Sequence, residues 1–190
     1  MDGVRLLAAT ADRIDRITHA VGRVCAYFTV ATVLICFATV YLRYAQGVGF
    51  VWLQESYVWT HVAAIMFGSS YALLKGGFVR VDMVYNRMSE RRKAWVDLFG
   101  TIVFMGPFIW MMGVSGWAFF DASWRMGERS AYESGLPATY VLKGTMLAFV
   151  ALVGLQGLAI VARCLVVLLS TGGREPVAPA DAAYVEGAAK

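Results

Sequence analysis

Four long segments without Asp, Glu, Lys or Arg dominate the pattern of hydrophobic and polar positions. They cover residues 24–42, 57–74, 98–120 and 144–162, with lengths of 19, 18, 23 and 19 residues. A helix rises about 1.5 Å per residue, so roughly 20 residues cross a hydrocarbon core of about 30 Å. A helix in the core of a soluble protein is normally shorter and carries a polar stripe. The pattern therefore predicts an all-α integral membrane protein with four transmembrane helices.

The segment before the first hydrophobic stretch, residues 1–23, shows a helical pattern of a different kind. Its apolar residues recur at every third or fourth position, and charged residues occupy the other faces. The apolar positions are Val4, Leu7, Ala11, Ile14, Ile17 and Val21. This pattern predicts an amphipathic interfacial helix, which either anchors the chain on the inner leaflet or docks a partner.

The connection between the second and third hydrophobic segments predicts another surface element. Gly76 and Gly77 end the preceding helix, and apolar residues then return at helical spacing. Those apolar residues are Val81, Val84, Tyr85 and Met88. We expect a short cytoplasmic helix along the membrane surface, and Arg80 and Asp82 beside it form a candidate pair for binding another subunit.

Local signals also mark the third and fourth helices. Ser89 is a suitable N-cap for a helix that begins in the following charged residues. Gly106-Pro107 predicts a kink within that helix, because proline cannot donate the backbone hydrogen bond. Pro137 suits the first turn of the fourth helix.

Basic residues divide unequally between the two sides of the predicted membrane domain, residues 24–169. Thirteen of the 17 Lys and Arg residues lie in the N-terminal segment, the second connection and the C-terminal segment, and four lie in the other two connections. The positive-inside rule then places both termini in the cytoplasm. The tail, residues 170–190, is rich in Gly, Ala and Pro, which predicts disorder. The net charge of +4 thus reflects topology and contact with anionic membrane lipid, not nucleic-acid binding.

The absence of charge from the hydrophobic segments bears on function. Ionisable groups inside a membrane are costly and usually mark ion or substrate paths. Their absence indicates that, if this chain serves transport, translocation takes place in another subunit. Cys25, Cys36 and Cys164 show no CxxC pairing or metal-ligand spacing. We therefore expect a helper subunit with no enzymatic activity, no metal site and no cofactor of its own.

His61 is the one histidine within a hydrophobic segment. A haem held by two histidines would need a second histidine at the same depth, and the other histidine, His19, lies in the N-terminal segment. We expect His61 to be a structural residue, hydrogen-bonded near the outer end of the second helix.

Four further residues are candidates for a subunit interface or for packing within the chain. The amide of Gln156 should find a partner across a helix interface, and Gly68 belongs to a run of small residues that permits close helix approach. Glu55 and Lys143 both fall near the outer interface. They could join the second and fourth helices by a salt bridge, or each could extend to the lipid headgroups.

Several short motifs, in a fixed order, resemble those of a known family. The motifs are Trp52-Leu53-Gln54-Glu55, Val79-Arg80-Val81-Asp82, Ser89 followed by Arg91-Arg92, and Gly135-Leu136-Pro137. Over residues 12–169 the chain is similar to the small membrane subunit of tripartite ATP-independent periplasmic (TRAP) transporters. The first and last motifs, with Leu155-Gln156-Gly157-Leu158, look most like the branch labelled for mannitol or chloroaromatic compounds. Phe78 departs from the pattern, because members commonly have histidine there.

The resemblance implies a secondary transport system of the bacterial inner membrane, driven by a cation gradient, usually sodium. In such a system a periplasmic binding protein captures an organic anion, a large multi-span permease subunit carries the substrate and ion sites, and the small subunit braces the large one. Two other classes stay open: a membrane anchor that holds haem or quinone in a redox complex, and a free-standing four-helix membrane protein. The transported substrate does not follow from this chain.

Overall fold

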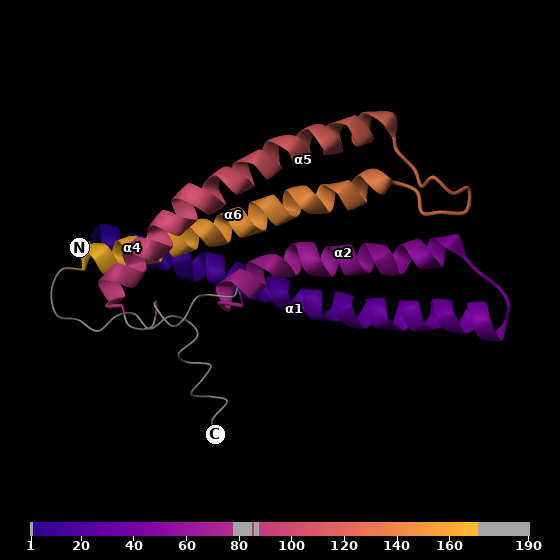
Figure 1. The fold of residues 1–190 in the computed structure, drawn as a ribbon, viewed down its shortest axis with the longest axis horizontal. Helices are drawn as coiled ribbons and strands as arrows, with labels where there is room; N and C mark the ends of the chain where they lie inside the picture. The colour runs from indigo at the N-terminus through magenta and orange to yellow at the C-terminus, as the bar shows by residue number, and fades with distance from the viewer. Residues whose placement is uncertain (1, 78–84, 86–87, 171–190) are drawn as a thin grey trace, which may run out of the picture.

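The chain is built from long helices that run along a common axis (Figure 1). The computed structural model describes residues 2–77, 85 and 88–170. The elements in chain order are α1 (Asp2–Ala45), α2 (Val51–Leu74), α4 (Glu90–Gly100), the π-helical turn η1 (Thr101–Met105), α5 (Gly106–Met126) and α6 (Thr139–Leu169). No strand occurs among these described residues, so the all-helical prediction is confirmed for them.

Three helical segments are long and apolar enough to cross a membrane: residues 3–45, 90–126 and 139–169. The 24 residues of α2 would rise about 36 Å, which is sufficient length. It carries several Trp, Tyr, Ser and Thr residues and is not among these three segments. A helical membrane protein is therefore supported, and the fourth span, α2, stays a prediction.

The N-terminal segment is not a separate interfacial helix, because α1 continues through it without a break for 44 residues. Ala11 on α1 packs against Ala159 and Ala162 on α6, and Leu7 and Ile14 pack around them. The apolar face predicted for residues 1–23 thus packs, at least in part, against α6. Figure 1 shows α1 beside α6 near the N-terminus and beside α2 farther along.

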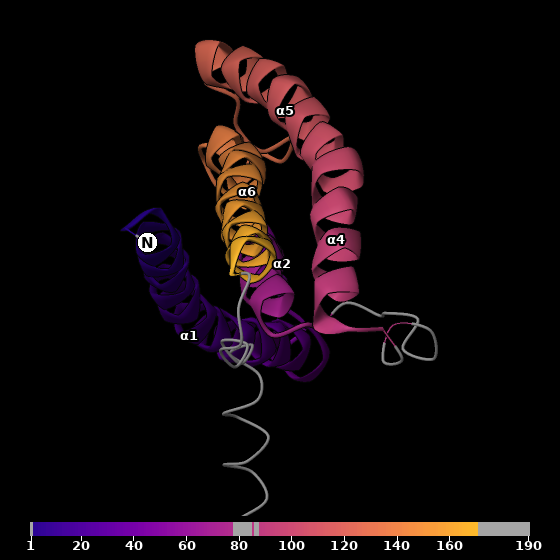
Figure 2. The ribbon, with the colours of Figure 1, turned by 90° about the vertical axis from the view of Figure 1, so that its left-hand side faces the viewer.

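The kink predicted at Gly106-Pro107 takes the form of a π-helical turn just before it. Helix α4, η1 and α5 follow one another without interruption from Glu90 to Met126. The Gly106 N–H donates to the Thr101 carbonyl, five residues back. Since Pro107 has no N–H to donate, a widened turn before it avoids a clash with the preceding carbonyls. The resulting rod is curved over its whole length in Figure 2.

The helix ends agree in part with the sequence signals. Ser89 occupies the N-cap position of α4 with an extended backbone, although its side chain makes no capping hydrogen bond. Gly127 ends α5 with φ +58°, a conformation that glycine adopts at little cost. Helix α6 begins only at Thr139, so the expectation that Pro137 lies in its first turn is wrong by two residues.

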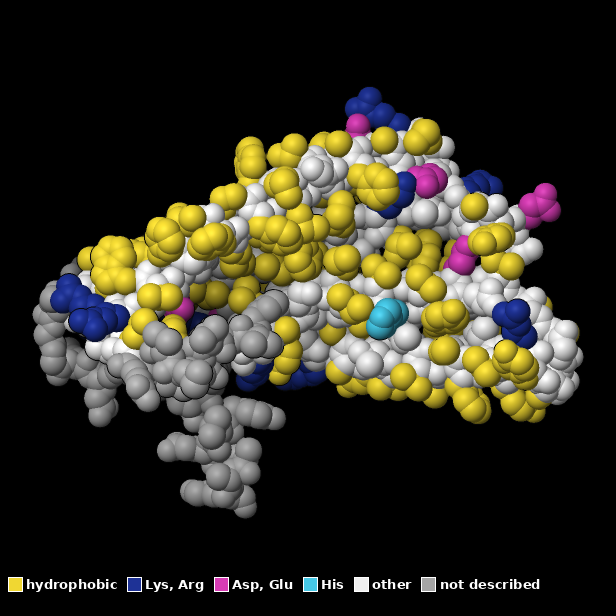
Figure 3. All heavy atoms as spheres, in the orientation of Figure 1, with side chains coloured by type: hydrophobic (Ala, Val, Ile, Leu, Met, Phe, Trp, Pro, Cys, Tyr) yellow, Lys and Arg dark blue, Asp and Glu magenta, His cyan; other side chains and the backbone are white. Residues whose placement is uncertain are grey.

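Large apolar side chains cover most of the surface of the described chain. Phe37, Phe104 and Trp110 are 69%, 70% and 76% exposed. In Figure 3 hydrophobic side chains spread along the length of the molecule, while the charged side chains on that face concentrate toward its ends and one edge. A continuous apolar surface of this extent requires lipid or another protein to cover it.

Gly68 serves packing within the chain. A β-carbon at this position would lie 3.8 Å from the Cβ and 3.9 Å from the Sγ of Cys25 on α1. At Gly68 the small-residue face of α2 therefore approaches α1, and a role of Gly68 in a subunit interface stays a prediction.

The contact between Gly68 and Cys25 leads to a size-dependent expectation. Gly68→Ala should leave thermal stability in detergent nearly unchanged, because the methyl group meets Cys25 at ordinary van der Waals distance. Gly68→Leu should destabilise the chain by about 1–3 kcal/mol, because the longer side chain must push α1 away. Equal melting temperatures for the two variants would contradict this arrangement.

Candidate functional sites at the two ends of the helices

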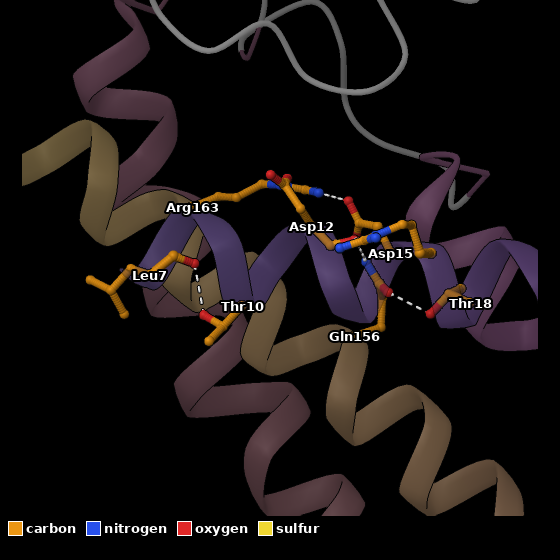
Figure 4. Close-up of polar contacts among 8 residues, drawn as sticks. Leu7, Thr10, Asp12, Asp15, Thr18, Gln156 and Arg163 are labelled. Atoms are coloured by element: carbon orange, nitrogen blue, oxygen red, sulfur yellow. Dashed lines mark hydrogen bonds and ion pairs between the residues drawn. The ribbon is translucent and has the colours of Figure 1, made fainter. Parts of the chain in front are cut away.

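A buried polar cluster joins α1 to α6, and we call it the α1–α6 cluster: Asp15, Thr18, Gln156 and Arg163. The Thr18 Oγ1 donates to the Gln156 Oε1 at 2.9 Å, and the Gln156 Nε2 donates to the Asp15 Oδ1 at 3.1 Å. The Arg163 guanidinium pairs with the other carboxylate oxygen of Asp15. Figure 4 shows this chain of contacts passing between the two helices. Gln156 and Thr18 are 0% and 2% exposed, and Asp15 is 8% exposed.

The α1–α6 cluster satisfies its own hydrogen-bonding groups. Both oxygens of the Asp15 carboxylate are occupied, one by Gln156 and the other by Arg163. No buried side-chain polar atom in the described chain lacks a hydrogen-bond partner. A cluster with its acceptors filled fixes helix geometry and leaves little capacity for a ligand. The prediction that Gln156 finds a partner across a helix interface is confirmed, and the partners are Thr18 and Asp15.

Sequence reasoning missed Asp15, Thr18 and Arg163, although a signal was present. Asp15 and Thr18 follow Ala11 at i+4 and i+7, so all three lie on one helix face, next to the apolar positions of residues 1–23. Two hydrogen-bonding residues on an otherwise apolar face indicate a polar partner on the opposing helix. Which of the later helices supplies that partner depends on the tertiary arrangement.

At the opposite end of the helices, Glu55 holds the loop between α5 and α6. The carboxylate of Glu55 accepts from the Ser130 hydroxyl through one oxygen and from the Leu136 N–H, at 2.5 Å, through the other. A β-carbon at Gly135 would lie 2.8 Å from the Glu55 Oε1, so glycine is needed for this close approach. Glu55 thus ties the start of α2 to a loop more than 70 residues later in the chain.

The predicted salt bridge between Glu55 and Lys143 does not form, because Lys143 pairs with another acidic residue, Glu128. The Lys143 Nζ pairs with the Glu128 Oε2 at 2.5 Å and also lies 4.0 Å from the ring centroid of Phe119. The Ser123 hydroxyl donates to the same Glu128 oxygen at 2.5 Å. Glu128 thus accepts a charge-assisted hydrogen bond from Lys143 and a second hydrogen bond from Ser123. Glu55 receives its hydrogen bonds from the α5–α6 loop instead of from Lys143. The two hydrogen bonds to Glu128 hold the pKa of this residue below its ordinary value of 4.5, and the bond from Lys143 has the larger effect.

An open pocket of about 590 Å³ lies beside these acidic residues, between the start of α2 and the α5–α6 loop. Its lining mixes aromatic and polar side chains, among them Tyr57, Trp59, Glu55, Glu128 and Tyr132. Both acidic residues already accept hydrogen bonds from the chain itself. We assign no ligand to the pocket.

The ion pair between Lys143 and Glu128 should contribute to stability in a pH-dependent way. Because the pKa of Glu128 is lowered in the folded chain, this contribution is present above the ordinary carboxyl pKa and disappears as pH falls through the lowered value. We expect Lys143→Met to lower the melting temperature in detergent near neutral pH, and this difference should vanish in strong acid. Arg125→Met is the control, because its pair with Asp121 within α5 is exposed and contributes little. A difference that persists unchanged in strong acid would rule out Glu128 as its source.

His61 is not the hydrogen-bonded structural residue that the sequence suggested. Its side chain is exposed on α2, and it makes no hydrogen bond or ion pair to another described residue. His19, on α1, packs edge-on against Tyr71 with ring centroids 5.4 Å apart. Ten residues, or about 15 Å of helix, separate Tyr71 from His61, so the two histidines do not meet as a ligand pair.

Other predicted site residues fall outside the part of the chain that the structure describes. Arg80 and Asp82 lie there, as do Phe78, most of the predicted surface helix and the tail from residue 171 onward. Within the described ranges, no group of three or more His, Cys, Asp or Glu residues is arranged to hold a metal ion. The three cysteines are free thiols.

Comparison with known proteins gave one finding. The family model described as "Tripartite ATP-independent periplasmic transporters, DctQ component" matches residues 32–167. This range covers residues 32–45 at the end of α1, all of α2, α4, η1 and α5, and α6 almost to its end. No curated protein and no solved structure gave a significant match.

Proposed function

The chain belongs to the family of small DctQ components of TRAP transporters, and from this premise we propose that it braces the large permease subunit of a secondary transporter in the bacterial inner membrane. The substrate in this proposal is an organic anion, captured by a periplasmic binding protein and driven across by a cation gradient, most simply of sodium. The substrate and ion sites belong to the large subunit.

The observation that carries this proposal is the distribution of polar groups in the described helices. At the two ends of the helices, Asp15 pairs with Arg163 and Glu128 pairs with Lys143. The hydrophobic stretches between them contain no Asp, Glu, Lys or Arg. An ion or anion crossing the membrane needs polar groups along its path, and this chain supplies few of them. Transport by the whole system then depends on a partner.

The proposed topology places both termini in the cytoplasm, with α2 as the fourth span. The α1–α6 cluster then lies toward the cytoplasm, and Glu55, Glu128 and the α5–α6 loop lie toward the periplasm. In a variant without its three native cysteines, single cysteines at Gly3 and Arg92 should react with a membrane-impermeant maleimide only after the membrane is opened. A cysteine at Glu133, in the α5–α6 loop, should react in intact cells. Labelling at Arg92 in intact cells would reverse the orientation.

Reconstitution tests the bracing role directly. A large permease subunit that co-purifies with this chain is placed in proteoliposomes, with and without this chain, together with the periplasmic binding protein. The anion used is the one that raises the melting temperature of the binding protein in a screen of organic anions. We expect uptake only with both membrane subunits present, and only under an inward sodium gradient. Equal uptake by the large subunit alone would refute a bracing role.

The same preparation tests the two alternative functions, a redox membrane anchor and a free-standing membrane protein. A visible absorbance spectrum with a haem band, or reduction of an added quinone, would support a redox anchor. A chain that purifies without the large subunit from cells expressing both would support a free-standing membrane protein.

A further inference from the structure

Resting on the proposed function, we infer that the exposed stripe of α2 made of Val58, His61 and Ile65 is a contact surface for one transmembrane helix of the large permease, and that this helix presents a hydrogen-bonding side chain to the imidazole of His61. The inference specifies which face of the chain meets the partner and what chemistry the partner brings there.

The three residues of the α2 stripe share one side of the helix. They follow the i, i+3, i+7 spacing of a helix–helix seam, and Val58 and Ile65 are 42% and 53% exposed. His61, between them, is exposed as well. Beyond Trp52 in its first turn, every other residue of α2 is at least partly covered by the rest of the chain.

The neighbouring faces of α2 are already occupied within the chain. The Thr32 hydroxyl of α1 donates to the Thr60 hydroxyl at 2.9 Å, and Gly68 lies against Cys25. Ser70 and Leu74, at the other end of α2, are 0% and 6% exposed. Helix α2 also packs against α6. The α2 stripe is therefore the side on which another protein can approach α2 without displacing a helix of this chain.

The position of His61 along α2 makes lipid a poor neighbour. His61 follows Glu55 by six residues, so it lies about 9 Å farther from the polar end of the helix. A neutral imidazole has one N–H donor and one nitrogen acceptor, and the described chain satisfies neither. Hydrocarbon offers no hydrogen bond, and polar side chains of membrane helices find partners on neighbouring helices.

The apolar residues on either side of His61 indicate what kind of helix surface the partner presents. Val58 and Ile65 suit a helix face built of apolar and small residues, which permits close approach. Between them, a hydroxyl, amide or carboxyl group on the partner can engage the imidazole. A water-soluble protein such as the periplasmic binding protein cannot reach this depth. The large permease subunit is the transmembrane partner that the proposed function supplies.

The test uses the full chain co-expressed with the large permease subunit that the proposed function requires. A benzophenone amino acid is placed at position 61 or, as the control, at Val114, which is 57% exposed on α5. Irradiation should cross-link the chain to the permease from position 61 with at least about five times the yield from position 114. Adducts to phospholipid alone at position 61, or equal yields at both positions, would overturn the inference.

Substitutions at His61 provide a second readout. Co-purified permease per chain should fall about five-fold or more for His61→Leu, which cannot hydrogen-bond, and should stay near the wild-type level for His61→Gln. Since His61 is exposed, both variants should elute as a single peak in size-exclusion chromatography. Undiminished recovery with His61→Leu would overturn the inference while leaving the proposed function in place. Failure of the wild-type chain to recover the permease would instead refute the proposed function, and the inference with it.

Discussion

Replacing Arg163 with leucine is expected to lower the stability of the chain in detergent by about 2–3 kcal/mol. The substitution leaves the Asp15 carboxylate, 8% exposed, with the Gln156 amide as its remaining side-chain partner. Removing one member of a buried ion pair commonly costs about 3–5 kcal/mol, because the other charge stays buried without compensation. We place the expected loss below that range, since the Arg163 side chain is 32% exposed and water can screen part of the interaction.

A double-mutant cycle tests whether Asp15 is the origin of that loss. Asp15→Asn removes the charge that Arg163 compensates, while its amide can still bond to Gln156. Adding Arg163→Leu to Asp15→Asn should therefore cost much less than Arg163→Leu in the wild-type chain. The measurement is thermal unfolding followed by tryptophan fluorescence. If Arg163→Leu costs the same in both backgrounds, the ion pair with Asp15 contributes nothing to stability.

Replacing Gly22 with alanine is expected to have an effect of similar size about two helical turns beyond Asp15 on α1. A β-carbon at position 22 would overlap the ring of Tyr71 on α2 and lie 2.9 Å from its Cβ. The Tyr71 ring has little freedom to turn aside, because His19 packs on it and the Lys75 Nζ lies 5.8 Å from its centroid. The two helices must therefore separate, which we expect to cost about 1–3 kcal/mol.

Two variants make this expectation specific to the contact between Gly22 and Tyr71. Gly68→Ala is the matched control, since it places the same extra methyl group between the same two helices where there is room for it. Tyr71→Ala should remove the two ring contacts and leave only the contact with the β-carbon at position 71, so the alanine at position 22 should cost less in that background than in the wild-type chain. Destabilisation by Gly22→Ala that persists unchanged in the Tyr71→Ala background would point to helix propensity or backbone effects instead of the clash.

The sequence predicted the candidate site residues unevenly, and the reason differs from residue to residue. Gln156 was recognisable because an amide in an apolar segment needs a partner, and the structure confirms that it has two. Glu55 and Lys143 were recognisable as interfacial charges, but the sequence could not pair them correctly. Their true partners, the loop around Ser130 and the side chain of Glu128, lie in a connection without regular structure. No helical or strand period constrains side-chain positions there.

His61 shows the opposite case, in which a sound general rule gave the wrong local result. A histidine in an apolar helix usually finds a hydrogen bond inside its own protein, and that expectation assumes that all of its neighbours belong to one chain. Here the side of α2 that carries His61 faces away from the other helices. The exposure of this residue fits the proposed contact with a partner subunit.

The sequence by itself determined the helical class, the membrane character and the family of this protein. Each of these follows from properties that are local or additive along the chain, namely the length of apolar segments, the absence of charge within them and short motifs in a fixed order. Only the tertiary structure decided that α1 runs unbroken for 44 residues and that Asp15 meets Arg163. It also decided that Gly22 leaves less room for a β-carbon between α1 and α2 than Gly68 does. Those outcomes depend on helix rotation and crossing. Apolar segments of similar composition do not determine helix rotation or crossing, because many rotations bury almost the same hydrophobic area. A few polar pairs and close contacts between small residues then select one arrangement of the helices.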